Sequence, residues 1–232
     1  MSEYCFGIID ENMEESLTIQ RTILINKPSY VSEDQIKFKE FSLSGAADNL
    51  PKEISNEVMD CVSSGEIQSL IVDYQLLIQA ETVSETIEGT EIFKRITTLV
   101  PKFPVVLLTN LPEDCLAKEF VDADKVYSKR SFFKVDEEYS KEKVSNLFNN
   151  ISKYLSARNR LDVSLHEALL NMEEEGYTQE VFQKIVELER QLDDYLPMEI
   201  GQLEKALDVS QLQDAVSLIQ EAKDLLGDTD ET

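Results

Sequence analysis

Short apolar runs alternate with longer amphipathic stretches along the first 160 residues of the chain. The runs are rich in β-branched residues, and continuous runs of this length are typical of strands buried on both faces of a sheet. Five strands are predicted, at residues 4–9, 36–43, 70–73, 104–109 and 124–129. The amphipathic stretches have apolar residues three and four positions apart, which is the spacing of one helix face. Five helices are predicted, at residues 14–25, 52–62, 91–99, 114–121 and 140–158.

Strands that alternate with helices predict an α/β fold, in which a parallel sheet is doubly wound and helices cover both of its faces. The expected architecture is flavodoxin-like, with five strands in the order 2-1-3-4-5. In that order the first and third strands are neighbours at the switch point of the sheet, where open α/β sheets bind their ligands. The polar residues at the carboxyl ends of the strands are therefore the candidates for a functional site.

The rest of the chain has no strand pattern and predicts an all-α extension. Ser164 and Ser210 each begin a capping box, Thr178 can cap another helix, and Gly176 fits a helix stop. The apolar residues of these helices form narrow stripes, which are typical of a helical bundle or a coiled coil. We predict one domain at residues 1–158 and a helical interaction module at residues 159–232.

The charge of the chain restricts its partners. The sequence has 46 acidic and 22 basic residues, a net charge of −24, and 19 of the acids but only 4 of the bases lie from residue 161 onward. Because this charge repels phosphate backbones, nucleic acid is not expected as a partner. The three cysteines form no CxxC pair, and the sequence shows no signal-peptide pattern and no apolar run of membrane-spanning length. A cytoplasmic protein that does not enter a membrane is expected.

Polar residues with complementary chemistry follow the predicted strands. Asp10 and Glu11 follow the first strand, Asp73 ends the third, Thr109 ends the fourth and Lys129 ends the fifth. Carboxylates that crowd together repel one another, and a hard divalent cation such as Mg²⁺ relieves that repulsion. A carboxylate can also accept a phosphoryl group, while a lysine and a metal neutralise the charge on the phosphoryl oxygens. A threonine hydroxyl can donate to such an oxygen.

This set of motifs resembles the receiver domain of two-component response regulators. The resemblance covers roughly residues 3–158 and rests on five segments in order, at residues 8–11, 70–76, 89–93, 105–109 and 127–129. It implies that Asp73 is phosphorylated and that Thr109 and Lys129 contact the phosphoryl group. It also implies a Mg²⁺ site formed by Asp10, Glu11, Asp73 and the backbone carbonyl of Gln75.

The sequence departs from the receiver pattern at several positions. Leu77 stands where receivers usually have a proline, and the loop at residues 77–88 is longer than usual. Arg130 replaces the proline that normally follows the lysine, and Val126 occupies a position that is commonly aromatic. These departures favour a rival interpretation, in which the chain is a pseudo-receiver adaptor that binds a partner constitutively without phosphorylation.

The main prediction is a phospho-accepting signalling protein of a phosphorelay. The resemblance implies a histidine kinase or a phosphotransfer protein as phosphodonor. The acidic helices at residues 159–232 would contact an unknown protein partner, and stripes of this length also permit a homodimer. We do not expect an enzyme: a phosphatase with an aspartate nucleophile usually has a second aspartate two residues later, where Gln75 stands, and the chain has no glycine-rich phosphate loop. His166 is expected to be an ordinary helix residue, because the sequence after it lacks the lysine-glycine pair of phosphotransfer domains.

Overall fold

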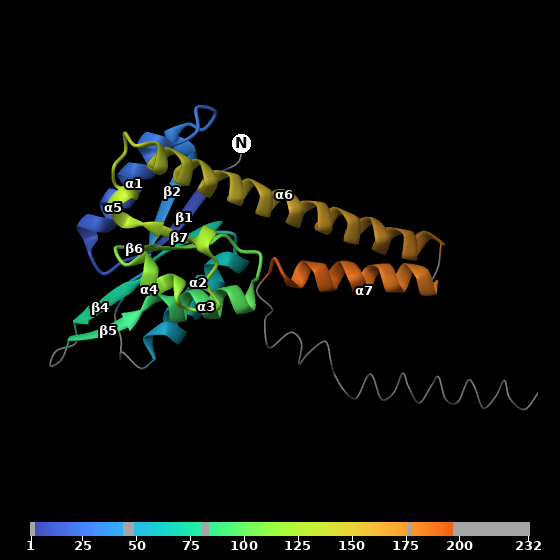
Figure 1. Cartoon of the computed structure of the whole chain (residues 1–232). Helices are drawn as coiled ribbons and strands as arrows, with labels where there is room; N and C mark the ends of the chain where they lie inside the picture. Colours follow the sequence, from blue (N-terminus) through green and yellow to red (C-terminus); the bar gives the residue numbers. More distant parts are fainter. Residues whose placement is uncertain (1–2, 44–48, 80–83, 176–177, 197–232) are drawn as a thin grey trace, which may run out of the picture. The chain divides into compact units, whose positions relative to one another are not determined.

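A computed structural model of the chain describes residues 3–43, 49–79, 84–175 and 178–196. The chain divides into two compact units, Met1–Pro197 and Met198–Thr232. The described residues all belong to the first unit, which contains a parallel sheet with helices on both faces (Figure 1). The helix predicted after Ser210 lies outside the described residues.

The sheet has five parallel strands in the order β2-β1-β3-β6-β7. These strands are β1 (Tyr4–Ile9), β2 (Ile36–Glu40), β3 (Ser69–Asp73), β6 (Val105–Thr109) and β7 (Val126–Ser128). The predicted order 2-1-3-4-5 and the flavodoxin-like fold class are confirmed. Ile9 pairs with Val72, so the residues that follow β1 lie beside Asp73 at the carboxyl end of β3.

Successive side chains of β3 point to opposite faces of the sheet, as the pleat requires. Ile71 joins the apolar cluster that α1 (Met13–Asn26) and α6 (Glu138–Glu175) cover. Leu70 and Val72 join the cluster under α2 (Leu50–Ser63) and α3 (Gly89–Leu99). All three side chains are buried, and each contributes about 1.5–3 kcal/mol to the free energy of unfolding. The two clusters hold the end of β3 in a fixed position.

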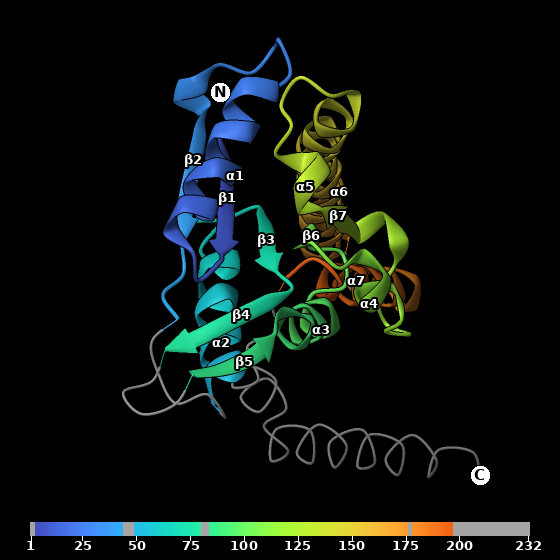
Figure 2. The same ribbon diagram turned by 60° about the vertical axis from the view of Figure 1, so that its left-hand side comes forward.

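A β-hairpin follows Asp73, where the sequence predicted a long polar loop. Its strands are β4 (Gln75–Gln79) and β5 (Ser84–Glu88), which pair antiparallel (Figure 2). Leu76 is buried in the α2 and α3 cluster, and Ile87, opposite it, packs against the same cluster. The prediction of a loop was wrong because these apolar residues stand among polar ones, whereas tertiary burial and cross-strand pairing stabilise the hairpin.

Several predicted boundaries also differ from the structure. The predicted fourth helix is reduced to α4 (Pro112–Leu116), since the chain continues in turns in which Lys118 and Val121 donate to Cys115 and Lys118. β2 ends at Glu40, and β7 ends at Ser128, so that Lys129 begins the short helix α5 (Lys129–Phe132). Two 3₁₀ turns, Glu33–Gln35 and Ala123–Lys125, precede β2 and β7.

The helix predicted at residues 140–158 continues to Glu175, so Ser164 lies inside α6 and begins no new helix. The sequence of α6 has no glycine or proline, and the capping box at Ser164 is only a local alternative to a continuous helix. The predicted domain boundary at residue 158 falls inside this helix. None of the described helices is both long enough and apolar enough to cross a membrane.

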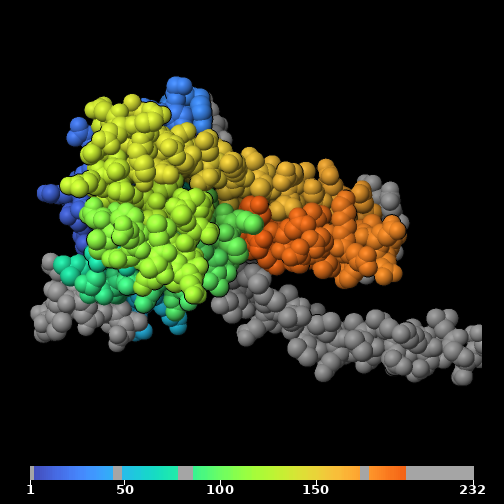
Figure 3. All heavy atoms as spheres, viewed as in Figure 1, coloured from blue at the N-terminus to red at the C-terminus, as the bar shows by residue number. Residues whose placement is uncertain are grey.

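The second helix of the extension, α7 (Gln179–Asp193), packs beside α6 (Figure 3). Thr178 caps it as predicted, and its hydroxyl oxygen accepts a hydrogen bond from the Val181 amide at 3.2 Å. Ala168 of α6 and Ile185 of α7 are among the buried residues of the two helices. The Tyr154 hydroxyl donates to the Tyr195 carbonyl at 2.6 Å, which fastens the end of α7 to α6 near the sheet.

Gly89 is required for the close approach between the first turn of α3 and the end of β3. Its amide donates to the Tyr74 carbonyl at 2.7 Å, and a Cβ at this position would lie 1.9 Å from the Asp73 carbonyl oxygen. Because that oxygen belongs to the backbone, only a shift of β3 or α3 can relieve the clash.

Gly89→Ala is therefore expected to lower the free energy of unfolding by about 1–3 kcal/mol, as overpacking does in other proteins. Urea denaturation followed by circular dichroism measures the change. Gly65→Ala tests the cost of an unfavourable backbone conformation rather than that of close packing, because Gly65 has a positive φ of 74° but open space around it. An unchanged stability of Gly89→Ala would contradict the close approach.

Candidate functional site

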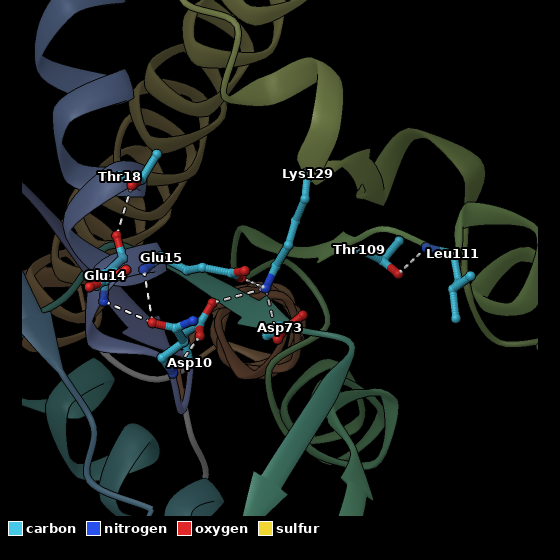
Figure 4. A network of polar contacts seen from close by, with 9 residues as sticks. Asp10, Glu14, Glu15, Thr18, Asp73, Thr109, Leu111 and Lys129 are labelled. Atoms are coloured by element: carbon cyan, nitrogen blue, oxygen red, sulfur yellow. Dashed lines mark hydrogen bonds and ion pairs between the residues drawn. The ribbon is translucent and has the colours of Figure 1, made fainter.

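Asp10, Asp73 and Lys129 lie together at the carboxyl edge of the sheet (Figure 4). The Lys129 Nζ lies 2.8 Å from Asp73 Oδ2 and 3.1 Å from Asp10 Oδ2. The three side chains are 4%, 8% and 0% exposed for Lys129, Asp73 and Asp10. A buried ammonium thus pairs with two buried carboxylates that lie at the ends of different strands, in the region where the sequence predicted a site.

Local hydrogen bonds fix the turn between β1 and α1. Asp10 Oδ1 accepts from the Asn12 amide at 2.9 Å, and Asn12 Oδ1 accepts from the Glu14 amide at 2.9 Å. Asn12 is therefore the N-cap of α1, a position that favours asparagine. The second oxygen of Asp10 is left for Lys129.

Lys129 is held by the start of α5 and by α6. The Ser128 amide donates to the Tyr139 hydroxyl oxygen at 3.0 Å, and the Ser140 hydroxyl donates to the Phe132 carbonyl at 2.6 Å. Both contacts join α5 or the residue before it to the first turns of α6. The position of the Lys129 backbone is thereby coupled to the long helix.

Asp10, Glu11 and Asp73 form an acidic cluster with oxygens suited to a hard cation. One carboxylate oxygen from each of the three residues lies within 4.8 Å of the others. Mg²⁺ takes oxygen ligands and is usually bound by one or two carboxylates together with water and phosphate oxygens. The donor set fits this ion, although Lys129 contacts two of the same carboxylates.

The backbone carbonyl of Gln75 is available as a further oxygen ligand. Directly opposed residues in an antiparallel ladder alternate between hydrogen-bonded and non-hydrogen-bonded pairs. Because Gly89 donates to Tyr74, the next pair, Gln75 and Glu88, is a non-hydrogen-bonded pair. The Gln75 carbonyl is therefore not used between β4 and β5, and Gln75 lines the same cavity as Asp73.

The cavity at this edge has a volume of about 310 Å³. Its lining is mostly polar and combines predicted site residues with residues of α1, the hairpin and the loop after β6. The lining residues are Glu11, Glu15, Asp73, Gln75, Leu77, Thr86, Thr109, Asn110 and Lys129. A group of phosphate size can therefore reach Asp73 from solvent.

The electrostatics of the site favour a proton on Asp73. Burial raises the pKa of the Asp73 carboxyl to about 7; Lys129 opposes this rise, and Asp10 and Glu11 add to it. Burial also raises the pKa values of Asp10 and Glu11. Burial works against the charged form of Lys129, but Asp73 and Glu15 raise its pKa above the usual range. Lys129 therefore remains charged while Asp73 titrates near neutral pH.

Thr109 is buried at the end of β6 and lines the cavity. Its hydroxyl oxygen accepts a hydrogen bond from the Leu111 amide at 2.9 Å, and the side chain is turned toward the loop after β6 (Figure 4). Thr109 thus stands at the predicted place, but its hydroxyl contacts the loop rather than the cluster around Lys129.

Two features of the site were missed in the sequence. Glu15 contacts Lys129 from the first turn of α1, and Leu77 and Thr86 of the hairpin line the cavity. The predicted helix at residues 14–25 could have indicated Glu15, because Glu15 lies in its first turn, close in the chain to Asp10 and Glu11. The hairpin residues had no comparable signal. His166 is exposed on α6.

The fold and the site define a class of protein: a doubly wound α/β domain with an acidic cluster and a buried lysine at its switch point. No known protein-family model matches the chain, and no curated protein matches it. Among solved structures it is similar to the RcsB response regulator of Salmonella typhimurium, a protein described as conformationally dynamic for DNA interaction. The identity is 13% and the TM-score 0.39, over 83% of this chain and 93% of that chain. A likeness this distant assigns no function.

Proposed function

We propose that the chain is a receiver-type signalling protein that accepts a phosphoryl group on Asp73. One observation carries the proposal: Asp73, Glu11 and Lys129 line one cavity at the switch point of a five-stranded parallel sheet, and Asp10 belongs to the same acidic cluster. This arrangement unites an acceptor carboxylate, oxygen ligands for a cation and a fixed positive charge, which together suit phosphoryl transfer.

In the proposed reaction, an Asp73 carboxylate oxygen attacks the phosphorus of the donor. The bond from phosphorus to the donor atom breaks, and the donor leaves with the electron pair. Lys129 neutralises charge on the phosphoryl oxygens. Asp10, Glu11 and the Gln75 carbonyl provide the oxygen ligands of the site. Mg²⁺ bound by these residues would supply further neutralisation of the phosphoryl oxygens. The Thr109 hydroxyl would have to turn from the loop to donate to one of them.

A histidine kinase or phosphotransfer protein is the proposed phosphodonor, and the chain would signal by protein contacts rather than by catalysing a reaction of its own. Phosphorylation adds charge beside Lys129, whose backbone is coupled to α6 through Tyr139 and Ser140. Between residues 159 and 196 the chain has ten acidic and three basic residues. This negative surface favours a protein partner or a second copy over nucleic acid.

A pseudo-receiver is the second candidate, and the ion pairs of Lys129 favour it. The ammonium already forms ion pairs with Asp10 and Asp73. The two buried carboxylates therefore have a positively charged partner within the chain itself. In this alternative the site is structural and the partner binds constitutively.

Incubation with acetyl phosphate and Mg²⁺ distinguishes the two candidates. Intact mass spectrometry is expected to show one phosphate-sized gain in the wild-type protein and none in Asp73→Asn, because an amide cannot replace the attacking carboxylate. Beryllofluoride with Mg²⁺ is expected to shift the amide NMR signals around Asp73, Thr109 and Lys129 in the wild type alone. Absence of both responses in the wild type would refute the acceptor and support the pseudo-receiver.

A further inference from the structure

Lys129 is shared by three carboxylates, of which only two belong to the proposed phosphoryl-transfer machinery. The Nζ contacts Asp10 and Asp73 and also the carboxylate of Glu15. The Glu15 side chain is 34% exposed, so it reaches Lys129 from the solvent side of the cluster. Figure 4 shows the three carboxylates arranged around the end of the Lys129 side chain.

The start of α1 explains this position of Glu15. Asn12 caps the helix through the amides of Glu14 and Glu15, which fixes the orientation of the first turn. In that turn Glu15 lines the cavity beside Asp73. The preceding residue, Glu14, is exposed, and its backbone carbonyl accepts from the Thr18 hydroxyl.

The contacts of Lys129 use the full hydrogen-bonding capacity of its ammonium. A lysine has three N–H donors, and the Nζ has three carboxylate partners, Asp10, Asp73 and Glu15. A phosphoryl group on Asp73 has several acceptor oxygens and carries more negative charge than the carboxylate it replaces. It can receive more than one donor from Lys129 only if Glu15 or Asp10 gives up its own.

We propose that Glu15 is a positioning residue that competes with the phosphoryl group for the ammonium of Lys129 and so restrains phosphorylation of Asp73. The inference rests on the proposed function of Asp73. Glu15 holds the Lys129 ammonium beside Asp10 and Asp73 before transfer, and its charge opposes the negative charge that arrives during transfer. Glutamine at this position keeps the size of the side chain and removes that opposing charge.

Glu15→Gln tests the competition, and Glu14→Gln is the matched control because it removes the same charge from the adjacent, exposed position. The time course of adduct formation is followed by intact mass over a range of acetyl phosphate concentrations with saturating Mg²⁺. Glu15→Gln is expected to raise the maximal rate by about tenfold at an unchanged half-saturating concentration, since like charge disfavours the charged transition state. Glu14→Gln is expected to keep the wild-type rate.

A spectroscopic measurement separates positioning from a structural role. The ¹⁵N signal of the Lys129 side chain is expected to shift in Glu15→Gln and to stay unchanged in Glu14→Gln. Wild-type rates and an unshifted signal in Glu15→Gln would overturn the inference while leaving the acceptor function intact.

The same experiment also tests the proposed function of Asp73. If neither the wild type nor Glu15→Gln forms an adduct, the acceptor function fails and the inference fails with it. If only Glu15→Gln forms an adduct, and the double variant with Asp73→Asn forms none, the wild-type chain is no acceptor and the proposed function fails, whereas the restraint by Glu15 is supported.

Discussion

Lys129→Met is expected to lower the free energy of unfolding by about 3–5 kcal/mol at pH 8, because it leaves buried carboxylates without their counter-ion. Lys129 is 4% exposed, and its ammonium contacts Asp10, Asp73 and Glu15. Methionine keeps most of the volume and removes the charge, so lost packing contributes little. Urea denaturation at pH 8 without divalent cations measures the loss.

Lys134→Met is the control for this variant. Lys134 pairs with Glu137 at 2.8 Å on the surface, where both side chains are about half exposed. Exposed ion pairs contribute little to stability, so this variant should unfold like the wild type. Added Mg²⁺ should restore part of the stability of Lys129→Met if the freed carboxylates bind it. Equal stabilities of the two variants would contradict the role of Lys129 as the counter-ion of the site.

Asp73→Asn is expected to make the protein more stable than the wild type at pH 8. The pKa of Asp73 is about 7 in the folded protein, whereas an aspartate in an unfolded chain titrates near 3.9. Between these values the unfolded state releases a proton that the folded state keeps, so the free energy of unfolding falls as pH rises. The stabilisation that the proton on Asp73 gives to the folded state is complete below pH ~4 and lost above pH ~7.

The pKa of Asp73 is about three pH units higher in the folded than in the unfolded protein. At about 1.4 kcal/mol for each pH unit, the gain in the free energy of unfolding is roughly 4 kcal/mol at most. Asparagine cannot ionise, so the difference between variant and wild type should grow from pH 4 to pH 7 and then stay constant. Denaturation across this pH range, with a chelator present, measures it. A constant difference for Asp73→Asn would contradict the raised pKa.

The sequence predicted the sheet and most of the candidate site for the same physical reason. The run that ends at Asp73 is short, β-branched and continuously apolar, which predicts a buried strand, and the topology of such sheets then brings the residues after β1 and β3 together. Lys129 was correctly associated with this edge although it begins α5 instead of ending a strand. The roles of these residues in binding Mg²⁺ and phosphate stay predictions.

The remaining features depend on contacts that a local pattern does not contain. The β4–β5 hairpin exists because Leu76 and Ile87 find an apolar cluster built by distant residues. The capping box at Ser164 satisfies the rule for a helix start, but the uninterrupted helix around it provides the same backbone hydrogen bonds. Glu15 reaches the site only because the first turn of α1 directs its side chain toward Lys129.

The helix α6 is continuous, and its first turns lie close to Lys129, so a tilt of the helix near the sheet moves its far end. Its first turns are bound to Ser128 and Phe132, and it reaches Glu175 without a glycine or proline hinge. From Phe148, which packs on the sheet, to Glu175 the helix extends about 40 Å at 1.5 Å per residue. A tilt of about 5° at the sheet would displace the far end, and α7 with it, by about 3–4 Å. A small tilt of α6 at the sheet would thereby give a larger displacement at its far end.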